Sequence, residues 1–171
     1  MENELIENLG TSGPDTLNGT ENGDLLGGLA GDDILFGFGG DDQLSGDLGV
    51  DTLRGGDGDD TLDGGGDDDL LFGDAGADEI NGGGGDDTII GSGGKDSIKG
   101  NRGEDQLFGG VGKDNLQGGG QSDTLDGGSG NDTLSGQNGD DNVSGGEGND
   151  VIKGGSGDDM LFGNSGDDQI F

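Results

Sequence analysis

An aliphatic residue recurs at every ninth position of the chain, from Leu17 to Ile170, without insertion or deletion. An aspartate stands two residues before each of them, and a glycine stands seven residues before. In Thr133-Leu134-Ser135, as in the other copies, one apolar residue lies between two residues that are mostly polar. This alternation predicts a very short strand, whose centre faces a core while its neighbours face outward.

The six positions before each short strand are rich in Gly, Asp, Asn and Ser, which indicates turns. A helix is excluded, because glycine recurs at least every nine residues and costs about 1 kcal/mol each time in a helix. Strands of about three residues need partners, so we expect successive strands on opposite faces of a thin sandwich. The predicted fold is all-β, a right-handed parallel β-roll (β-solenoid) with two short-strand sheets, about 18 residues per coil and about nine coils.

The repeat also predicts the core and the division of the chain. Leu17 and every second copy up to Leu161 line one inner face, and Leu26 to Ile170 line the other. We assign 10–171 to the β-roll of nonapeptide repeats and 1–9 to an N-terminal lead-in or cap. Within 1–9, Leu5, Ile6 and Leu9 either cover the first coil, as a helical turn or short strand, or belong to a frayed end.

Composition alone indicates a disordered chain. Of 171 residues 48 are Gly, only 24% are hydrophobic, and the formal net charge is −33. The strict period indicates a stacked solenoid instead. Both interpretations hold if a ligand that binds only the folded chain neutralises the charge.

The residues that are missing exclude several classes of function. There is no Cys and no His, hence no disulfide framework, thiol chemistry or typical zinc site. No isolated acid, base or nucleophile constellation stands out, so we do not expect an enzyme. The acidic balance argues against nucleic acid and anionic membrane surfaces as direct partners. No apolar run is long enough for a membrane span, and the acidic N-terminus lacks the features of a secretory signal peptide.

The recurring aspartates are the candidate metal ligands. In an 18-residue coil they stack along two edges about 5 Å apart, where bare carboxylates repel and a hard divalent cation between them reverses the effect. Calcium accepts six to eight oxygens in flexible geometry, whereas magnesium demands an octahedron. The predicted carboxylate ligands are Asp15, Asp24, Asp33, Asp42, Asp51, Asp60, Asp69, Asp78, Asp87, Asp96, Asp105, Asp114, Asp123, Asp132, Asp141, Asp150, Asp159 and Asp168.

The unit Gly-Gly-x-Gly-x-Asp-x-apolar-x, seen intact in Gly127 to Ser135, resembles the RTX (repeats-in-toxin) nonapeptide of calcium-binding parallel β-rolls. We number its positions one to nine from the first glycine, so that the recurring aspartate is at position six. The resemblance covers residues 10–171. It implies that each calcium bridges a turn and the turn 18 residues later. The first turn contributes the carbonyls of positions two and four with its aspartate, and the second contributes those of positions one and three with its own.

Carried over to this chain, the resemblance implies about 16 bridging sites, whose calcium charge of about +32 nearly cancels the formal −33. One site would use Gly83, Gly85 and Asp87 with Gly100, Arg102 and Asp105. The representative carbonyls of further turns are those of Gly110, Gly112, Gly127, Gly128, Ser129, Gly130, Gly145 and Glu147.

Two turn positions, four and five, vary between copies of the repeat. Position four is glycine except at Asn22, Asp67 and Gln121, and we expect positive φ there. Asn and Asp tolerate that geometry, while Gln121 fits poorly and should be strained. Position five is often acidic, either as a solvated face that raises the local cation concentration or as direct ligands. Its acidic copies include Asp32, Asp41, Asp59, Asp68, Asp86, Asp140, Asp158 and Asp167.

One outer face is more apolar than the other. Five of its residues in the last repeat position are large and apolar: Phe36, Phe72, Ile90, Phe108 and Phe162. Either this face packs on a partner, such as a second copy, or the side chains only stiffen a thin sheet.

We therefore expect a calcium-binding, calcium-induced folding module of a secreted bacterial protein. The resemblance implies an extracellular location and type I secretion. The final residues, 168–171, form either part of such a signal or simply the last strand. The alternative is an extracellular adhesive or structural rod that uses the apolar face. Ice binding is disfavoured, because Thr16, Thr52, Thr88 and Thr124 occur only on alternate coils.

Overall fold

In the computed structural model, which describes residues 7–171, the regular elements are all β-strands in two sheets. The ten-stranded sheet contains β1 (Glu7–Leu9), β3 (Leu25–Gly27), β5 (Gln43–Leu48), β7 (Thr61–Gly66), β9 (Glu79–Gly84), β11 (Ser97–Arg102), β13 (Asn115–Gly120), β15 (Thr133–Asn138), β17 (Val151–Ser156) and β19 (Gln169–Ile170). The nine-stranded sheet contains β2 (Thr16–Asn18), β4 (Ile34–Gly39), β6 (Thr52–Asp57), β8 (Leu70–Gly76), β10 (Thr88–Gly94), β12 (Gln106–Gly112), β14 (Thr124–Ser129), β16 (Asn142–Glu147) and β18 (Met160–Ser165).

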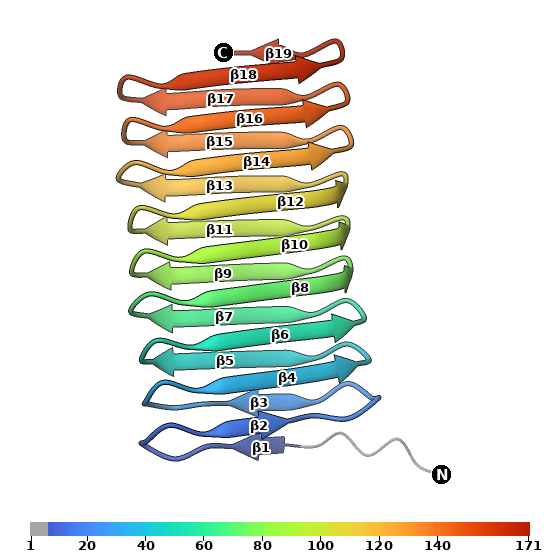
Figure 1. The fold of residues 1–171 in the computed structure, drawn as a ribbon, viewed down its shortest axis with the longest axis vertical. Helices are drawn as coiled ribbons and strands as arrows, with labels where there is room; N and C mark the ends of the chain where they lie inside the picture. Colours follow the sequence, from blue (N-terminus) through green and yellow to red (C-terminus); the bar gives the residue numbers. More distant parts are fainter. Residues whose placement is uncertain (1–6) are drawn as a thin grey trace.

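Successive strands alternate between the two sheets, and each strand pairs in parallel with the strand two further along the chain (Figure 1). Partners are 18 residues apart, as Leu35 with Leu53 and Leu53 with Leu71 show. The chain is therefore a β-solenoid of about nine coils with 18 residues in each, which confirms the predicted all-β architecture.

The strands are longer than the sequence predicted. β4 has six residues and β8 has seven, whereas lengths of three or fewer occur only at the ends of the sheets. Pairing of β4 with β6 runs from Ile34 to Phe36, skips Gly37 and resumes at Phe38. The prediction of about three residues was wrong, because ladder pairing between coils continues through a glycine-rich half that composition alone indicates as turn.

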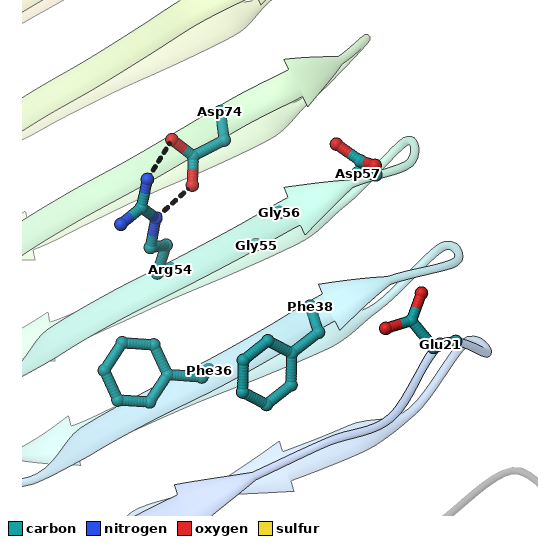
Figure 2. Close-up of a pocket in the computed structure, with 8 residues that line it drawn as sticks. All are labelled: Glu21, Phe36, Phe38, Arg54, Gly55, Gly56, Asp57 and Asp74. Atoms are coloured by element: carbon teal, nitrogen blue, oxygen red, sulfur yellow. Dashed lines mark hydrogen bonds and ion pairs between the residues drawn. The ribbon is translucent and has the colours of Figure 1, made fainter.

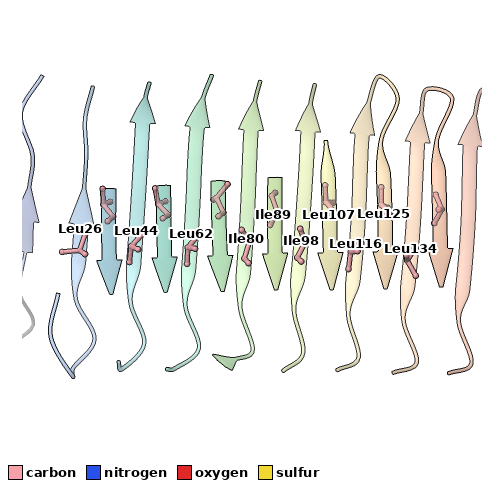
Figure 3. Packing of buried hydrophobic residues seen from close by; sticks show 14 of the residues in the cluster. Leu26, Leu44, Leu62, Ile80, Ile89, Ile98, Leu107, Leu116, Leu125 and Leu134 are labelled. Carbon is pink, nitrogen blue, oxygen red and sulfur yellow. The ribbon is translucent and has the colours of Figure 1, made fainter. Parts of the chain in front are cut away.

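The core is one continuous column of aliphatic side chains between the sheets (Figure 3). The repeat residues from Leu17 to Ile152 are all buried, and those of alternate repeats come from opposite sheets, as predicted. Leu161 is only partly buried and Ile170 is 47% exposed in the last coil. At the other end, β1 pairs with β3 and places Asn8 opposite Leu26. The predicted capping residues Leu5 and Ile6 lie outside the described residues.

Backbone geometry in the turns confirms most of the predictions for position four. Asp67 and Gln121 have φ of 76° and 79°, so Gln121 does adopt a left-handed conformation that is unusual for its type. Asn22 does not have positive φ, so that prediction was wrong for the first coils. Position two also has positive φ in most repeats, even where it is not glycine, as at Phe38 with φ of 80°.

Candidate metal centre at the two edges of the solenoid

The recurring aspartates lie where the chain passes from one sheet to the other. We call edge A the turns that enter the nine-stranded sheet, such as residues 28–33, and edge B the turns that enter the ten-stranded sheet, such as residues 37–42 (left and right in Figure 1). Each of these recurring aspartates, taken every nine residues from Asp24 to Asp150, is at most 3% exposed. The predicted carboxylates are thus brought together in two buried columns, one along each edge.

One oxygen of each carboxylate joins neighbouring turns. The backbone N–H of each aspartate donates a hydrogen bond to Oδ1 of the aspartate 18 residues later, from Asp15–Asp33 to Asp150–Asp168. All such neighbouring pairs make this bond, at distances of 2.7 to 3.0 Å. The aspartates therefore have a structural role that the sequence analysis did not foresee.

The other oxygen, Oδ2, is buried and has no hydrogen-bond partner within residues 7–171 at 14 of these aspartates. They are Asp33, Asp42, Asp51, Asp60, Asp69, Asp78, Asp87, Asp96, Asp105, Asp114, Asp123, Asp132, Asp141 and Asp150. An ionised oxygen that is buried without a partner is costly, so these atoms point to a ligand.

The glycine at position one keeps a side chain away from Oδ2. A Cβ built on Gly109 would lie 2.6 Å from the carbonyl oxygen of Gly127 and 2.7 Å from Asp114 Oδ2. At Gly127 the corresponding distances are 2.5 Å to Gly145 O and 2.7 Å to Asp132 Oδ2. A carboxylate oxygen and a carbonyl oxygen of the next turn thus flank one point, which a side chain would fill.

The remaining predicted carbonyls are placed in two ways. Those of positions two and four point along the rod at the next turn, since a Cβ on Gly128 or Gly148 would overlap Gly110 O or Gly130 O. Among those of position three, Arg102 O accepts a hydrogen bond of 3.0 Å from Gly85 N. Glu147 O likewise accepts one from Gly130 N, at 2.7 Å. The position-one carbonyls are therefore the ones that the structure places beside the same point as the orphaned oxygens, as at Gly109 and Gly127.

The first two turns differ from the others. Oδ2 of Asp15 accepts hydrogen bonds from the backbone N–H and the hydroxyl of Thr11, at 2.6 and 2.8 Å. Oδ2 of Asp24 accepts the same pair from Thr20, at 2.6 and 2.9 Å. Threonine at position two thus satisfies these carboxylates with protein atoms.

Position five forms a second ladder that the sequence analysis missed. Asp68 Oδ1 accepts the backbone N–H of Asp86, and Asp86 Oδ1 accepts that of Glu104, both at 2.8 Å. On edge B, Asp41 and Asp59 act in the same way. These side chains accept hydrogen bonds from the turn 18 residues later. The recurring aspartates at position six instead accept hydrogen bonds from the turn 18 residues earlier. The 18-residue recurrence of short polar side chains was the available signal.

Lysine interrupts the second ladder on edge B. Lys95 and Lys113 occupy position five in consecutive turns, and both are exposed. The ladder stops at Ala77 and resumes where Asn149 N donates to Asn131 Oδ1 at 2.8 Å. Edge B therefore carries less negative charge at its middle than edge A does.

Burial changes the acidity of the columns. It raises the pKa of Asp69, Asp78 and Asp87 to about 7, and that of Asp42 and Asp96 to about 6. Neighbouring carboxylates add to this rise, while the N–H of the preceding aspartate lowers the pKa in each case. The ionised columns are thus held in an environment that disfavours negative charge unless a cation is present.

The donors fit a hard cation. Most turns offer a buried carboxylate oxygen beside a backbone carbonyl, and oxygens of these two kinds are the ligands of calcium. Within the described 7–171, no three His, Cys, Asp or Glu side chains gather into a metal-binding group. A calcium ion at either edge would therefore take part of its coordination from the backbone.

Together these features define a class of protein: a parallel β-solenoid whose glycine-rich turns carry columns of buried aspartates. A family model described as the RTX calcium-binding nonapeptide repeat (4 copies) matches residues 9–44, 19–53, 45–80, 81–116, 99–134, 108–143 and 135–170. The chain therefore belongs to the RTX calcium-binding nonapeptide repeat family, which confirms the resemblance. This repeat is a structural calcium-binding unit rather than a catalytic domain.

Comparison with individual curated proteins finds no match. Among the residues that the structure describes, no helix has the length and hydropathy needed to cross a membrane.

Proposed function

We propose that the chain binds calcium along both edges and that this binding drives its folding. The observation that carries the proposal is the series of buried Oδ2 atoms without partners in the described chain, each beside a glycine at which a side chain would collide with it. In the proposed arrangement the aspartates from Asp15 to Asp168 form about 16 bridging sites. A representative site uses Asp87 and Asp105 with the carbonyls of Gly83, Gly85, Gly100 and Arg102.

Calcium supplies the positive charge that the folded chain lacks. With a formal net charge of −33 and buried columns of carboxylates, the folded form is opposed by repulsion and desolvation. An ion that binds only the folded form shifts the equilibrium toward it. Asp15 and Asp24, whose Oδ2 atoms already accept hydrogen bonds from threonines, contribute the least to calcium-driven folding.

The proposal includes secretion of the unfolded chain by a type I route and folding outside the cell. RTX repeats are typical of secreted bacterial proteins, which supports this location. Extracellular calcium is in the range in which weak sites with dissociation constants of about 10⁻⁴ to 10⁻³ M are filled.

Circular dichroism during a calcium titration tests the proposal. We expect a disordered chain in calcium-free buffer and a cooperative gain of β-sheet signal at about 10⁻⁴ to 10⁻³ M calcium. Magnesium at the same concentrations is the control and should produce little sheet. A chain that is fully folded in excess chelator contradicts calcium-driven folding.

A second candidate function is that of a structural or adhesive rod with an apolar face. Phe72, Ile90 and Phe108 are register partners on β8, β10 and β12, so they form a continuous column on the outer face of the nine-stranded sheet. We propose that this column, extended by Phe36 and Phe162, supports self-association. Sedimentation in calcium tests it: the parent chain should be larger than a variant with Phe36, Phe72 and Phe108 changed to Ser. Equal monomer masses contradict it.

A further inference from the structure

A shallow groove of about 480 Å³ lies on the outer face of the nine-stranded sheet, toward edge B. The side chains that line it are those of Glu21, Phe36, Phe38, Arg54, Asp57 and Asp74 (Figure 2). It is separate from the buried aspartate columns, because its lining side chains belong to outward-facing positions of the repeat.

The groove exists because one side chain is missing. Gly56 on β6 pairs with Phe38 on β4 and with Asp74 on β8, and it lies between two large or charged side chains. Its φ is +117°, and a Cβ there would overlap the carbonyl oxygen of Phe38. The depression is thus a fixed feature of the backbone rather than a side-chain fluctuation.

The floor of the groove is aromatic. The Phe36 and Phe38 rings are 6.0 Å apart between centroids, with planes inclined by 20°, and lie side by side along β4 (Figure 2). Phe38 is 51% exposed and has φ of 80°, at a repeat position that glycine occupies in many copies. A bulky residue in this conformation is strained and gains little burial here, so the fold alone does not account for the ring.

Within the described chain, some of the charged side chains around the floor are paired with each other and others are not. Arg54 is already paired with Asp74 through two hydrogen bonds, from Nε to Oδ2 and from Nη2 to Oδ1 (3.0 Å), and it lies over the Phe72 ring. Glu21 and Asp57 have no ion pair in the described part of the chain. Both occupy position three on edge B, on either side of Gly39, which has no side chain to fill the gap between them.

We propose that this groove binds a basic segment of a partner protein, with an arginine side chain over the Phe36 and Phe38 rings and its charge directed at Glu21 and Asp57. An aromatic face attracts a cation, and a planar guanidinium can stack on it while it reaches carboxylates. The formal charge of −33 also steers a basic partner toward the rod.

The first test titrates the full chain, in millimolar calcium, with a blocked Gly-Arg-Gly peptide. Phenylalanine-specific isotope labelling reports binding by NMR. We expect shifts confined to Phe36, Phe38 and their neighbours. The same peptide with citrulline, which has the shape of arginine without its charge, should bind at least about fivefold more weakly. Equal binding of the citrulline peptide, shifts spread along the rod, or no binding overturns the proposal.

Matched variants separate the groove from general acidity. Phe38→Gly suits the backbone and should weaken binding about five- to tenfold, while Leu29→Gly is the control, since Leu29 has φ of 77° and 44% exposure outside the groove. Glu21→Gln combined with Asp57→Asn should have a similar effect. Asp63→Asn combined with Asp126→Asn, which removes two charges outside the groove, should change affinity less than about twofold. Equal losses in the controls, or a calcium-dependent dimer that occupies the groove, contradict the assignment.

Discussion

The backbone N–H of Asp87 donates a 2.9 Å hydrogen bond to Oδ1 of Asp105, while Oδ2 of Asp105 is buried without a partner in the described chain. One carboxylate therefore ties two coils together and carries a charge that no protein atom compensates. Its first role stabilises the stack with or without metal. We propose that its second makes the stack depend on a cation.

Asp87→Asn separates these two roles. The amide keeps an acceptor for the N–H of Asp69, loses the charge, and can turn its NH2 toward Gly100 O, which lies beside the same point as Oδ2. We expect weaker calcium binding, yet a calcium-free chain that is more stable by about 1 kcal/mol. Calcium titration measures the first effect, and the sheet signal in chelator with added trimethylamine N-oxide, which favours the folded form, measures the second. Asp86→Asn in the same turn is the control, and reduced calcium-free stability with unchanged calcium binding contradicts the assignment.

The calcium-free solenoid should be stabilised by acid. Burial raises the folded-state pKa of Asp69, Asp78 and Asp87 to about 7, above an unfolded value of about 3.9. A raised pKa means that the folded state binds more protons, so this stability is fully present below about pH 4 and is lost as pH rises through 7. Circular dichroism in calcium-depleted buffer should show a β-sheet signal that falls as pH rises from about 4 to 8. A maximum near pH 7 contradicts it.

Acid should weaken the calcium-loaded state, because protons compete with calcium for the same oxygens. The calcium concentration at half-folding should therefore rise as pH falls from about 8 to 6. Sheet signal recorded during calcium titrations at several pH values measures this, and a midpoint independent of pH would count against carboxylate ligation.

Gly82→Ala should damage the site that Gly84→Ala leaves intact. A Cβ on Gly82 would overlap Asp87 Oδ2 and lie 3.0 Å from Gly100 O, whereas on Gly84 its nearest neighbour is Arg102 Cβ at 4.0 Å. Gly82→Ala should lower the free energy of unfolding by about 2 kcal/mol or more, whereas Gly84→Ala should change it by less than about 0.5 kcal/mol. Thermal unfolding in saturating calcium compares them, and equal effects would show that the space at position one is not required.

Replacing the two lysines on edge B with aspartate should restore the position-five hydrogen-bond ladder. Lys95→Asp with Lys113→Asp restores acceptors for two backbone N–H groups and adds negative charge. The double variant should remain disordered without calcium and fold at a similar or lower calcium concentration, with steeper salt dependence. Lys99→Asp with Lys153→Asp makes the same change of charge outside the ladder. If it produces the same shifts, net charge and not the ladder is responsible.

Much of the site was predictable because it repeats. The proposed ligand Asp87, the core residue Ile89 and the glycine at position one follow from a nine-residue period that only a stacked fold explains. The roles of Asp86 and Thr20 were not predictable in this way, since both depend on which side-chain oxygen faces which backbone N–H. The strand lengths were also missed, because pairing between coils overrides the turn preference of glycine.

The sequence by itself determined the period, the two inner faces and the family, since regular spacing of apolar and acidic residues admits one way of stacking that buries the former and aligns the latter. Only the tertiary structure decided how each carboxylate divides its oxygens. Asp105 Oδ1 meets the N–H of Asp87 because coils 18 residues apart lie within hydrogen-bonding distance, and Oδ2 is left beside a glycine. The position of Phe38 beside the empty space at Gly56 likewise depends on register between strands, which one strand's sequence does not contain.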